Sequence, residues 1–278
     1  MNYKIIVDSC CDMTRELAER LGVSAIAPMT IRVGQKEFID DETLDLPGFM
    51  AEMKASKEGA SSASPPPFAF MEAIESAIHS FVVTISSQLS GSFANAELGK
   101  SMAAENGVTD VHVFDSKSAS AGEVLVAMKL RELLSNGIPR EQIIKSINSF
   151  IDNMKTYFVL ERYDNLIKNG RLNKVTGKIV SMLNVKLVMG SDGDGSIILH
   201  AKPRGTTQML DKIVSFIKSS NRPTHGENMV ICHCNNLPLA NQLSSLVKKH
   251  FNFKEILIIP TRGAISLYAD DKGIVMAF

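Results

Sequence analysis

The chain repeats one unit that restricts its fold: a short apolar run ends at an aspartate or serine, and a helical stripe of apolar residues follows. Residues 5–7, 81–85 and 111–114 are such runs. Short runs that are apolar throughout are typical of strands buried on both faces, and strands that alternate with helices usually pair in parallel. We therefore predict an α/β fold whose amino-terminal part has a mostly parallel sheet with helices on both faces.

Between these units the pattern is less regular. Residues 25–33 predict one more strand, and apolar stripes predict helices over residues 49–53, 93–102, 124–133 and 141–154. Residues 56–67 read SKEGASSASPPP, a run of small and polar residues that ends in prolines. Such a run is either a disordered linker or a rigid surface loop.

The second half of the chain mixes hairpin and helix signals. Residues 190–195, GSDGDG, separate two apolar runs at 185–189 and 197–199, which predicts an antiparallel hairpin. Further helices are predicted over residues 178–183, 209–217 and 239–247, and further strands over residues 157–160, 229–232, 256–259 and 274–277. We predict two α/β domains, residues 1–154 and 155–278, of which the second is a mixed α/β domain.

Composition argues against several classes of function. The chain has 278 residues with 30 basic and 30 acidic side chains, no tryptophan and four tyrosines, so neither charge nor a stacking surface favours nucleic acid. Its first apolar run is too short for a secretion signal, and no apolar stretch reaches the ~20 residues that span a bilayer. We expect a cytoplasmic protein without an integral membrane segment.

The cysteines form two close pairs, Cys10-Cys11 and Cys232-His233-Cys234. The second pair places both thiols on one face of an extended segment, which raises the alternative of a zinc site, but zinc motifs usually space their ligands as C-x₂₋₄-C. Pairs this far apart in the sequence do not resemble a disulfide framework. We expect reduced, buried cysteines and no metal.

Residues 86–92, SSQLSGS, bring four hydroxyl groups and a glycine to the start of a predicted helix. Free N–H groups and the helix dipole at such a start favour an anion, whereas capping the helix needs only one serine, and the sequence leaves both interpretations open. A nucleophilic Ser90 is a third interpretation, but the G-x-S-x-G turn is absent and no histidine is placed to face this serine.

Three arginines follow apolar segments in predicted loops: Arg171 in NGR, Arg204 in KPRG and Arg262 in PTRG. Arginines in such places usually form structural ion pairs or face solvent. The functional alternative is a cluster that recognises a phosphate or the acidic surface of a partner protein. The sequence alone leaves both alternatives open.

Seven segments follow one another along the chain: IIVDSCCDMT, SASPPP, ISSQLSGSFANA, VFDSKSAS, FVLERYDNLIKNGRL, HAKPRGTTQML and PTRGAISLYADDKGIVMAF. In their order and spacing, the chain resembles the DegV family of bacterial fatty-acid-binding proteins. The resemblance extends over essentially the whole length of the chain.

The resemblance implies two α/β domains with one long-chain fatty acid in the cleft between them and no other cofactor. It implies that hydroxyl groups of Ser62 and Ser90 hold the carboxylate, with Gly91 and Ser92 adjacent. It also implies a protein that is not itself an enzyme and that presents the fatty acid to an ATP-dependent fatty acid kinase for phospholipid synthesis. Arg171 and Arg204 then serve docking and phosphoryl transfer near the pocket mouth.

One segment departs from the better-characterised members of that family. Those proteins carry a histidine in a C-terminal segment of the form G-x-H-x-G-P-G, whereas this chain has Thr261-Arg262-Gly263-Ala264. Two alternative functions remain: a serine esterase that acts on acyl substrates through Ser90, and a lipid sensor without a kinase partner.

Overall fold

The structure is a computed structural model that describes residues 3–56, 58–77, 79–172 and 185–278. Its strands are β1 (Lys4–Asp8), β2 (Val23–Ala27), β3 (Thr30–Val33), β4 (Lys36–Ile39), β5 (Ala60–Ala63), β6 (His79–Thr84), β7 (Asp110–Asp115), β8 (Thr156–Val159), β9 (Val188–Ser191), β10 (Ile197–Ala201), β11 (Asn228–His233), β12 (Glu255–Pro260) and β13 (Ile274–Ala277). Its helices are the 3₁₀ turn η1 (Ser9–Cys11) and α1 (Arg15–Leu21), α2 (Leu46–Ala55), α3 (Pro67–Glu75), α4 (Ser92–Glu105), α5 (Ala121–Ser135), α6 (Arg140–Asn153), α7 (Asp164–Lys168), α8 (Gly205–Ser219), α9 (Leu237–His250) and α10 (Gly263–Ala269).

The strands form three sheets. The parallel sheet has the order β2-β1-β6-β7, and every pairing in it is parallel. The mixed sheet has the order β10-β9-β8-β13-β11-β12, in which only β11 and β12 pair in parallel. A small antiparallel sheet, β4-β3-β5, extends to one side. The predicted α/β class, with a parallel amino-terminal sheet and a mixed carboxy-terminal one, is confirmed; the domain boundary after residue 154 stays a prediction.

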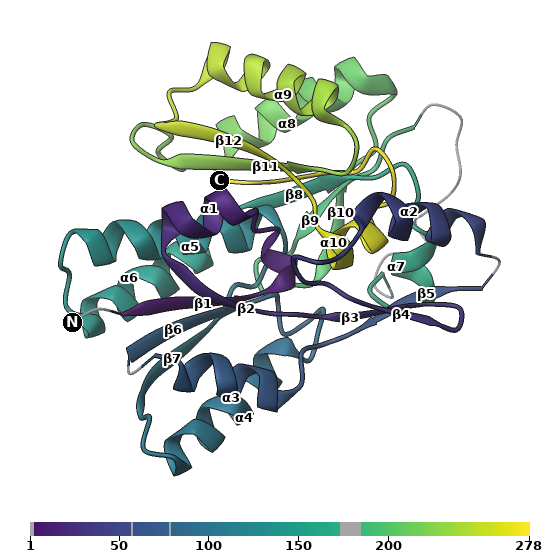
Figure 1. Ribbon diagram of the computed structural model, residues 1–278. Coiled ribbons are helices and arrows are strands. Elements are labelled where there is room, and N and C mark those ends of the chain that lie inside the picture. The colour runs from purple at the N-terminus through teal and green to yellow at the C-terminus, as the bar shows by residue number, and fades with distance from the viewer. Residues whose placement is uncertain (1–2, 57, 78, 173–184) are drawn as a thin grey trace.

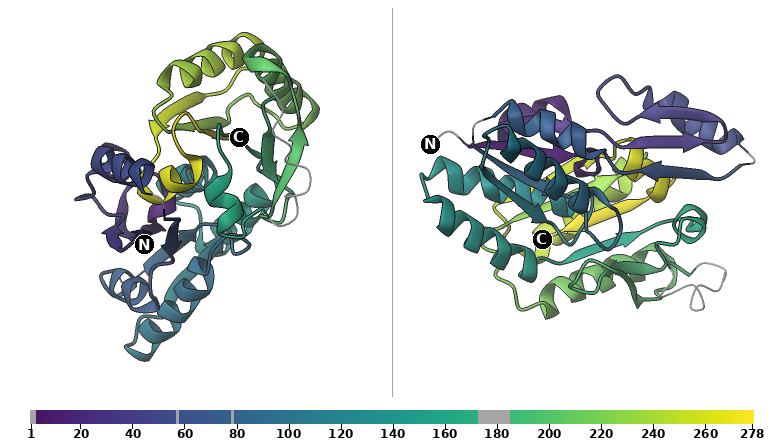
Figure 2. Two further views of the ribbon diagram at one scale, coloured as in Figure 1. Left: turned by 90° about the vertical axis from the view of Figure 1, so that its right-hand side faces the viewer. Right: turned by 90° about the horizontal axis from the view of Figure 1, so that it is seen from below.

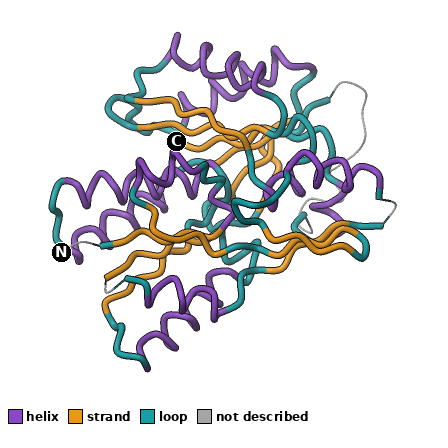
Figure 3. The backbone as a smooth tube through the Cα atoms, viewed as in Figure 1, coloured by secondary structure: helices purple, strands orange, loops and turns teal. Residues whose placement is uncertain are grey.

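Helices and sheets alternate in layers. Figures 1 and 3 show α3 and α4 below the parallel sheet, α1, α5 and α6 between the two large sheets, and α8 and α9 above the mixed sheet. Figure 2 shows the same layers from two further sides. In the described part of the chain, every helix is too short or too polar to cross a lipid bilayer.

Side chains of β1 show how the sequence pattern produces these layers. Ile5 and Val7 pack in the same cluster as Val124 of α5, whereas Ile6 packs with Phe70 of α3 on the other face of the sheet. Successive strand residues point to opposite faces, so a strand covered by helices on both sides must be apolar at every position. This is why residues 5–7 form an unbroken apolar run.

The structure corrects the prediction of one strand over residues 25–33. The chain instead forms β2 in the parallel sheet and β3 in the small sheet, and β4 was not predicted. Pro28 lies between the two strands and has no N–H to give to a ladder. The N–H of Met29 donates to Ser9 Oγ (3.0 Å), so the chain leaves the parallel sheet at this point.

The prediction for residues 56–67 was also incomplete. Residues 60–63 form β5, which pairs antiparallel with β3 so that Ser62 lies opposite Ile31. Alanine and serine have little intrinsic preference for strands, and pairing with a neighbouring strand decides the conformation here. Two short helices, α7 and α10, were not predicted either, and the helix predicted over residues 178–183 lies outside the described residues.

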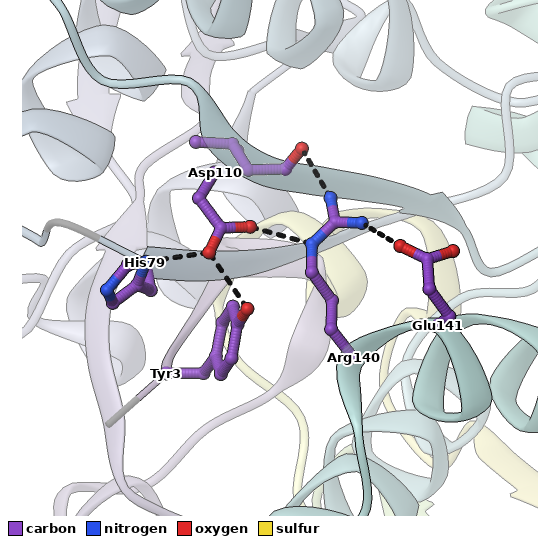
Figure 4. A network of polar contacts seen from close by, with 6 residues as sticks. Tyr3, His79, Asp110, Arg140 and Glu141 are labelled. Carbon is purple, nitrogen blue, oxygen red and sulfur yellow. Dashed lines mark hydrogen bonds and ion pairs between the residues drawn. The ribbon is translucent and has the colours of Figure 1, made fainter. Parts of the chain in front are cut away.

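A polar network closes the amino-terminal edge of the parallel sheet (Figure 4). The carboxylate of Asp110 accepts hydrogen bonds from the Tyr3 hydroxyl (2.8 Å) and lies 2.7 Å from Nδ1 of His79. It also pairs with Nε of Arg140 at 2.7 Å, and Arg140 pairs in turn with Glu141 at 2.8 Å. The network joins the start of the chain, β6, β7 and α6, at the edge opposite the loops that follow the strands.

Gly99 of α4 packs closely against the start of α3. A Cβ atom at this position would lie 2.6 Å from the carbonyl oxygen of Pro67 and 2.8 Å from Cβ of Phe70. We expect Gly99→Ala to lower the free energy of unfolding by about 1–3 kcal/mol, because overpacking outweighs the higher helix propensity of alanine. Urea denaturation measures this change. Gly59→Ala is the control, since nothing lies within 4 Å of a Cβ there; equal losses in both variants would contradict the packing argument.

Candidate functional site

A pocket lies where the loops that follow the parallel strands meet the mixed sheet. The empty space within it, which includes a part open to solvent, is about 840 Å³. Most of its wall is apolar and comes from both large sheets and from α10, through Met29, Ile85, Leu89, Phe158, Leu160, Leu166, Ile265 and Val275. This wall suits a flexible hydrocarbon chain.

The name polar cluster is used here for four of the polar side chains that line the pocket: Ser62, Ser90, Arg171 and Tyr268. Ser62 Oγ lies 2.9 Å from the hydroxyl oxygen of Tyr268. The guanidinium carbon of Arg171 lies 5.6 Å from the centre of the Tyr268 ring, a cation–π distance. The cluster unites residues from β5, the loop before α4, the segment after α7, and α10.

The charge of Arg171 is not neutralised within the part of the chain that the structure describes. Its Nε donates to the carbonyl oxygen of Leu89 (3.2 Å) and its Nη1 to that of Asn169 (2.7 Å). No carboxylate of the described residues forms an ion pair with it. A half-buried guanidinium held by carbonyl groups alone favours an anion beside it.

Helix α7 holds the polar cluster together. The side-chain amide of Asn165 donates to the carbonyl oxygen of Leu267 in α10 (2.8 Å), and that of Asn169, at the end of α7, donates to the carbonyl oxygen of Ala60 in β5 (2.9 Å). These bonds fix the two elements that carry Tyr268 and Ser62. The helix has five residues, too short for a periodic pattern, which is why the sequence did not reveal it.

The serine hydroxyl groups of residues 86–92, which lead into α4, have two different roles. Ser90 lines the pocket, and its Oγ accepts the N–H of Ser92 (3.2 Å). The Ser92 hydroxyl is buried and donates to Asp8, and Ser86 Oγ donates to the carbonyl oxygen of Gly195 (3.0 Å). Gly91 precedes α4 and gives it no side-chain cap. Of the predicted set in this loop, only Ser90 therefore has a side chain in the pocket wall.

The structure does not bring the three predicted arginines together. Arg204 is exposed just before α8, and its N–H donates to the side chain of Gln208 (3.0 Å). Arg262 is half-buried; its N–H donates to Asp12 and its Nη2 to the carbonyl oxygen of Asp41 (2.6 Å). Neither residue lines the pocket, whereas Arg171 does. Arg262 therefore makes the structural contacts that the sequence offered as one alternative.

Four carboxyl groups lie buried beneath the pocket, on Asp8, Asp12, Asp40 and Glu123. Asp40 accepts the N–H groups of Gly263 (2.9 Å) and Ala264 (2.8 Å), the first residues of α10. Burial raises the pKa of all four carboxyl groups, and that of Asp12 to about 8. Sequence analysis missed these residues, although Asp8 and Asp12 stand in the opening segment.

Glu123 differs from the other three carboxyl groups in its contacts. Within the described residues, neither oxygen of its carboxyl group has a hydrogen-bond partner, and burial together with the neighbouring Asp8 raises the pKa of Glu123 well above its ordinary value. Burial beside a second carboxyl group therefore favours the protonated form of Glu123.

The cysteines lie in the same region. All four are free and buried, as predicted, and Cys10 lines the pocket. Burial raises the pKa of the Cys10, Cys11 and Cys232 thiols well above the ordinary value, which keeps them protonated and unreactive. Within the described residues, no group of three histidine, cysteine or acidic side chains is arranged to hold a metal ion.

Comparison with known proteins places the chain in a family. The family model described as an uncharacterised protein of the DegV family matches residues 2–277. A DegV domain-containing protein of Streptococcus gordonii is 36% identical over 281 residues, which covers 100% of this chain and 99% of that protein.

Two solved structures are similar over nearly the full length. A DegV family protein from Ruminococcus gnavus, refined with vaccenic acid, superposes with a TM-score of 0.93 at 35% identity and 99% coverage of each chain. The Fatty Acid Kinase (Fak) B3 protein of Streptococcus pneumoniae, loaded with linoleic acid, superposes with a TM-score of 0.91 at 34% identity, covering 100% of this chain and 99% of that one.

The buried carboxyl groups predict how stability depends on pH. The pKa of Asp12 is about 8 in the folded chain and ~3.9 in an unfolded one, so between these values the folded state keeps a proton that the unfolded state has lost. The free energy of unfolding therefore falls as pH rises through this window, by up to about 1.4 kcal/mol per pH unit for each such carboxyl group.

Asp12→Asn removes one of these ionisations while keeping the side-chain shape. We expect the slope of unfolding free energy against pH, measured by urea denaturation between about pH 5 and 8, to become shallower by about one proton. Asp211→Asn, at an exposed position of α8, is the matched control and should keep the native slope. Identical slopes for Asp12→Asn and the native chain would show that Asp12 is ionised when folded.

Proposed function

The chain belongs to the DegV family, and from this premise we propose that it binds one long-chain fatty acid in the pocket between the parallel and mixed sheets. The apolar wall takes the acyl chain, and the polar cluster takes the carboxylate. Each buried CH₂ group contributes about 0.8 kcal/mol before the cost of ordering, so a tail of ~16–18 carbons supplies ample affinity.

The observation that carries this proposal is the unneutralised guanidinium of Arg171 in the wall of an apolar pocket. A ligand for this pocket must offer a negative charge to Arg171 and hydrocarbon to the rest of the wall, most of which is apolar. Hydroxyl groups of Ser62 and Ser90 stand ready to donate to the same anion. Gly91 and Ser92 act indirectly, by holding Ser90 at the start of α4. A fatty acid meets both requirements.

The relatives support the same ligand class. The Ruminococcus gnavus and Streptococcus pneumoniae proteins, at 35% and 34% identity, were solved with vaccenic acid and linoleic acid. Both are unbranched, unsaturated fatty acids, and a wall rich in leucine and isoleucine, with the adaptable side chain of Met29, suits a bent chain.

We propose further that this protein presents the bound fatty acid to an ATP-dependent fatty acid kinase and completes no reaction itself. The Streptococcus pneumoniae relative is named as the B3 protein of such a kinase. Arg171 lies beside the proposed carboxylate, where it can stabilise a transferred phosphoryl group, and the exposed Arg204 is free to contact an acidic partner surface. The cytoplasmic location stays a prediction from the sequence.

The esterase alternative is weakened by the histidines. All six lie in described residues, and none lines the pocket beside Ser90. A serine nucleophile needs a general base within hydrogen-bond reach, so Ser90 is proposed as a donor to the carboxylate.

The first test is native mass spectrometry of the protein purified from cells. We expect a mass increment of one fatty acid per chain, identified after denaturation as an unesterified acid. Preparations that never contain fatty acid, and a delipidated protein that takes up none when oleic acid is added, would contradict the proposal.

The second test concerns Arg171. We expect Arg171→Met to weaken the binding of oleic acid about 10- to 100-fold, the size of a charge-assisted contact, and to change the binding of methyl oleate much less. Calorimetric titration of delipidated protein measures both ligands. Arg162→Met is the control, because that arginine is 66% exposed and pairs with Asp164 at the surface. An equal loss for acid and ester would show that Arg171 acts through packing.

A further inference from the structure

We infer that Tyr268 is a positioning residue for the ligand carboxylate: it donates to Ser62 and thereby directs the Ser62 proton toward the anion. The inference rests on the proposed fatty-acid site and assigns a role to a residue that the sequence analysis did not single out. Tyr268 lies on α10, while Ser62 lies on β5, 206 positions earlier in the chain.

The hydroxyl protons of Tyr268 and Ser62 indicate this positioning role. The two hydroxyl oxygens lie 2.9 Å apart, and either can donate to the other. Two hydroxyl groups own two protons, of which their mutual bond uses one. Neither hydroxyl has a further hydrogen-bond partner among the described residues. Since both residues line the pocket, the remaining proton is available to a ligand atom.

The acidity of the two hydroxyl groups determines which of them donates to the other. A phenolic hydroxyl is more acidic than an alkyl one and is the better donor, so Tyr268 donates to Ser62. Ser62 then donates to the carboxylate, and because consecutive hydrogen bonds polarise one another, its donation is stronger than that of an isolated serine. Without Tyr268, the Ser62 proton is free to rotate toward other acceptors.

Contacts around Tyr268 hold its ring in one place. The carboxyl group of Asp40 accepts the first two N–H groups of α10, and Asn165 donates to the carbonyl oxygen of Leu267, next to Tyr268. The guanidinium of Arg171 lies over the ring face. A positioning residue must itself be fixed in this way if the group that it orients is to be precise.

The Ser62–Tyr268 bond also joins β5 to α10, so a purely structural role is the competing explanation. The two roles predict different results. A structural bond contributes to the melting temperature of the lipid-free protein and leaves ligand affinity unchanged, whereas a positioning bond makes the effects of Tyr268 and Ser62 on affinity depend on each other.

The experiment is a double-mutant cycle with oleic acid as the probe. Calorimetric titration of delipidated native protein, Tyr268→Phe, Ser62→Ala and the double variant gives four dissociation constants. Phenylalanine keeps the ring under Arg171 and removes only the hydroxyl. We expect Tyr268→Phe to weaken binding about 3- to 10-fold, the size of one neutral hydrogen bond, and the double variant to bind no more weakly than Ser62→Ala alone.

Tyr3→Phe is the matched control. The Tyr3 hydroxyl donates to Asp110 (2.8 Å) at the edge of the parallel sheet opposite the pocket, so this variant also loses a tyrosine hydrogen bond and should keep the native affinity. Thermal melting of the lipid-free variants separates loss of stability from loss of affinity.

Two results of this cycle would overturn the role inferred for Tyr268. Native affinity in Tyr268→Phe overturns it, and so do additive losses in the double variant, since these would mean that Tyr268 does not act through Ser62. A native protein that binds no oleic acid overturns the proposed function itself, and the inference with it. Native binding with an unaffected Tyr268→Phe variant removes only the role of Tyr268.

Discussion

Helix α5 lies between the two large sheets, and the rest of the structure depends on its burial there. Residues 121–128 are buried on every side, so this helix packs against both sheets at once. Its start is fixed by Ser120, whose N–H donates to the carbonyl oxygen of Cys10 (3.0 Å) and whose hydroxyl donates to Asp12. The pocket opens directly in front of this start, where Ser118, Ala119 and Ser120 form part of the wall. A helix whose first two turns are buried on all faces thus sets the spacing between the sheets and the position of the pocket.

The buried carboxyl groups connect the first loops of the chain to its C-terminal part. They do so without repelling an anionic ligand. Asp12 and Asp40, from the first loops, accept hydrogen bonds from the backbone N–H groups of residues 262–264. Burial raises the pKa of these carboxyl groups, which limits their negative charge beneath the pocket. Arg171 keeps its positive charge in the pocket wall. The balance of charge around the site therefore favours a carboxylate over a neutral lipid.

The sequence predicted those parts of the fold that depend on local patterns. Residues 5–7 and 81–83 are apolar throughout because both faces of their strands are covered, and the hairpin at 190–195 follows from its glycines. The resemblance to a family selected Ser62, which composition had assigned to a linker or loop. Sequence analysis did not identify Tyr268, α7 or α10, because their roles come from contacts between segments far apart in the chain. No local spacing predicts the hydrogen bond between Ser62 and Tyr268, which are 206 positions apart.

The central claim is that the polar cluster binds a fatty acid through an ionised carboxylate. Palmitic acid labelled with carbon-13 at its carboxyl carbon tests this most directly, because the chemical shift of that carbon reports ionisation while the acid is bound. With Arg171 beside it and serine hydroxyl groups donating to it, the pKa of the bound carboxyl group should lie well below the ~4.3 of an ordinary side-chain carboxyl group. A bound carboxyl group that titrates at or above that value would contradict the account, because it would place the carboxyl group away from the guanidinium.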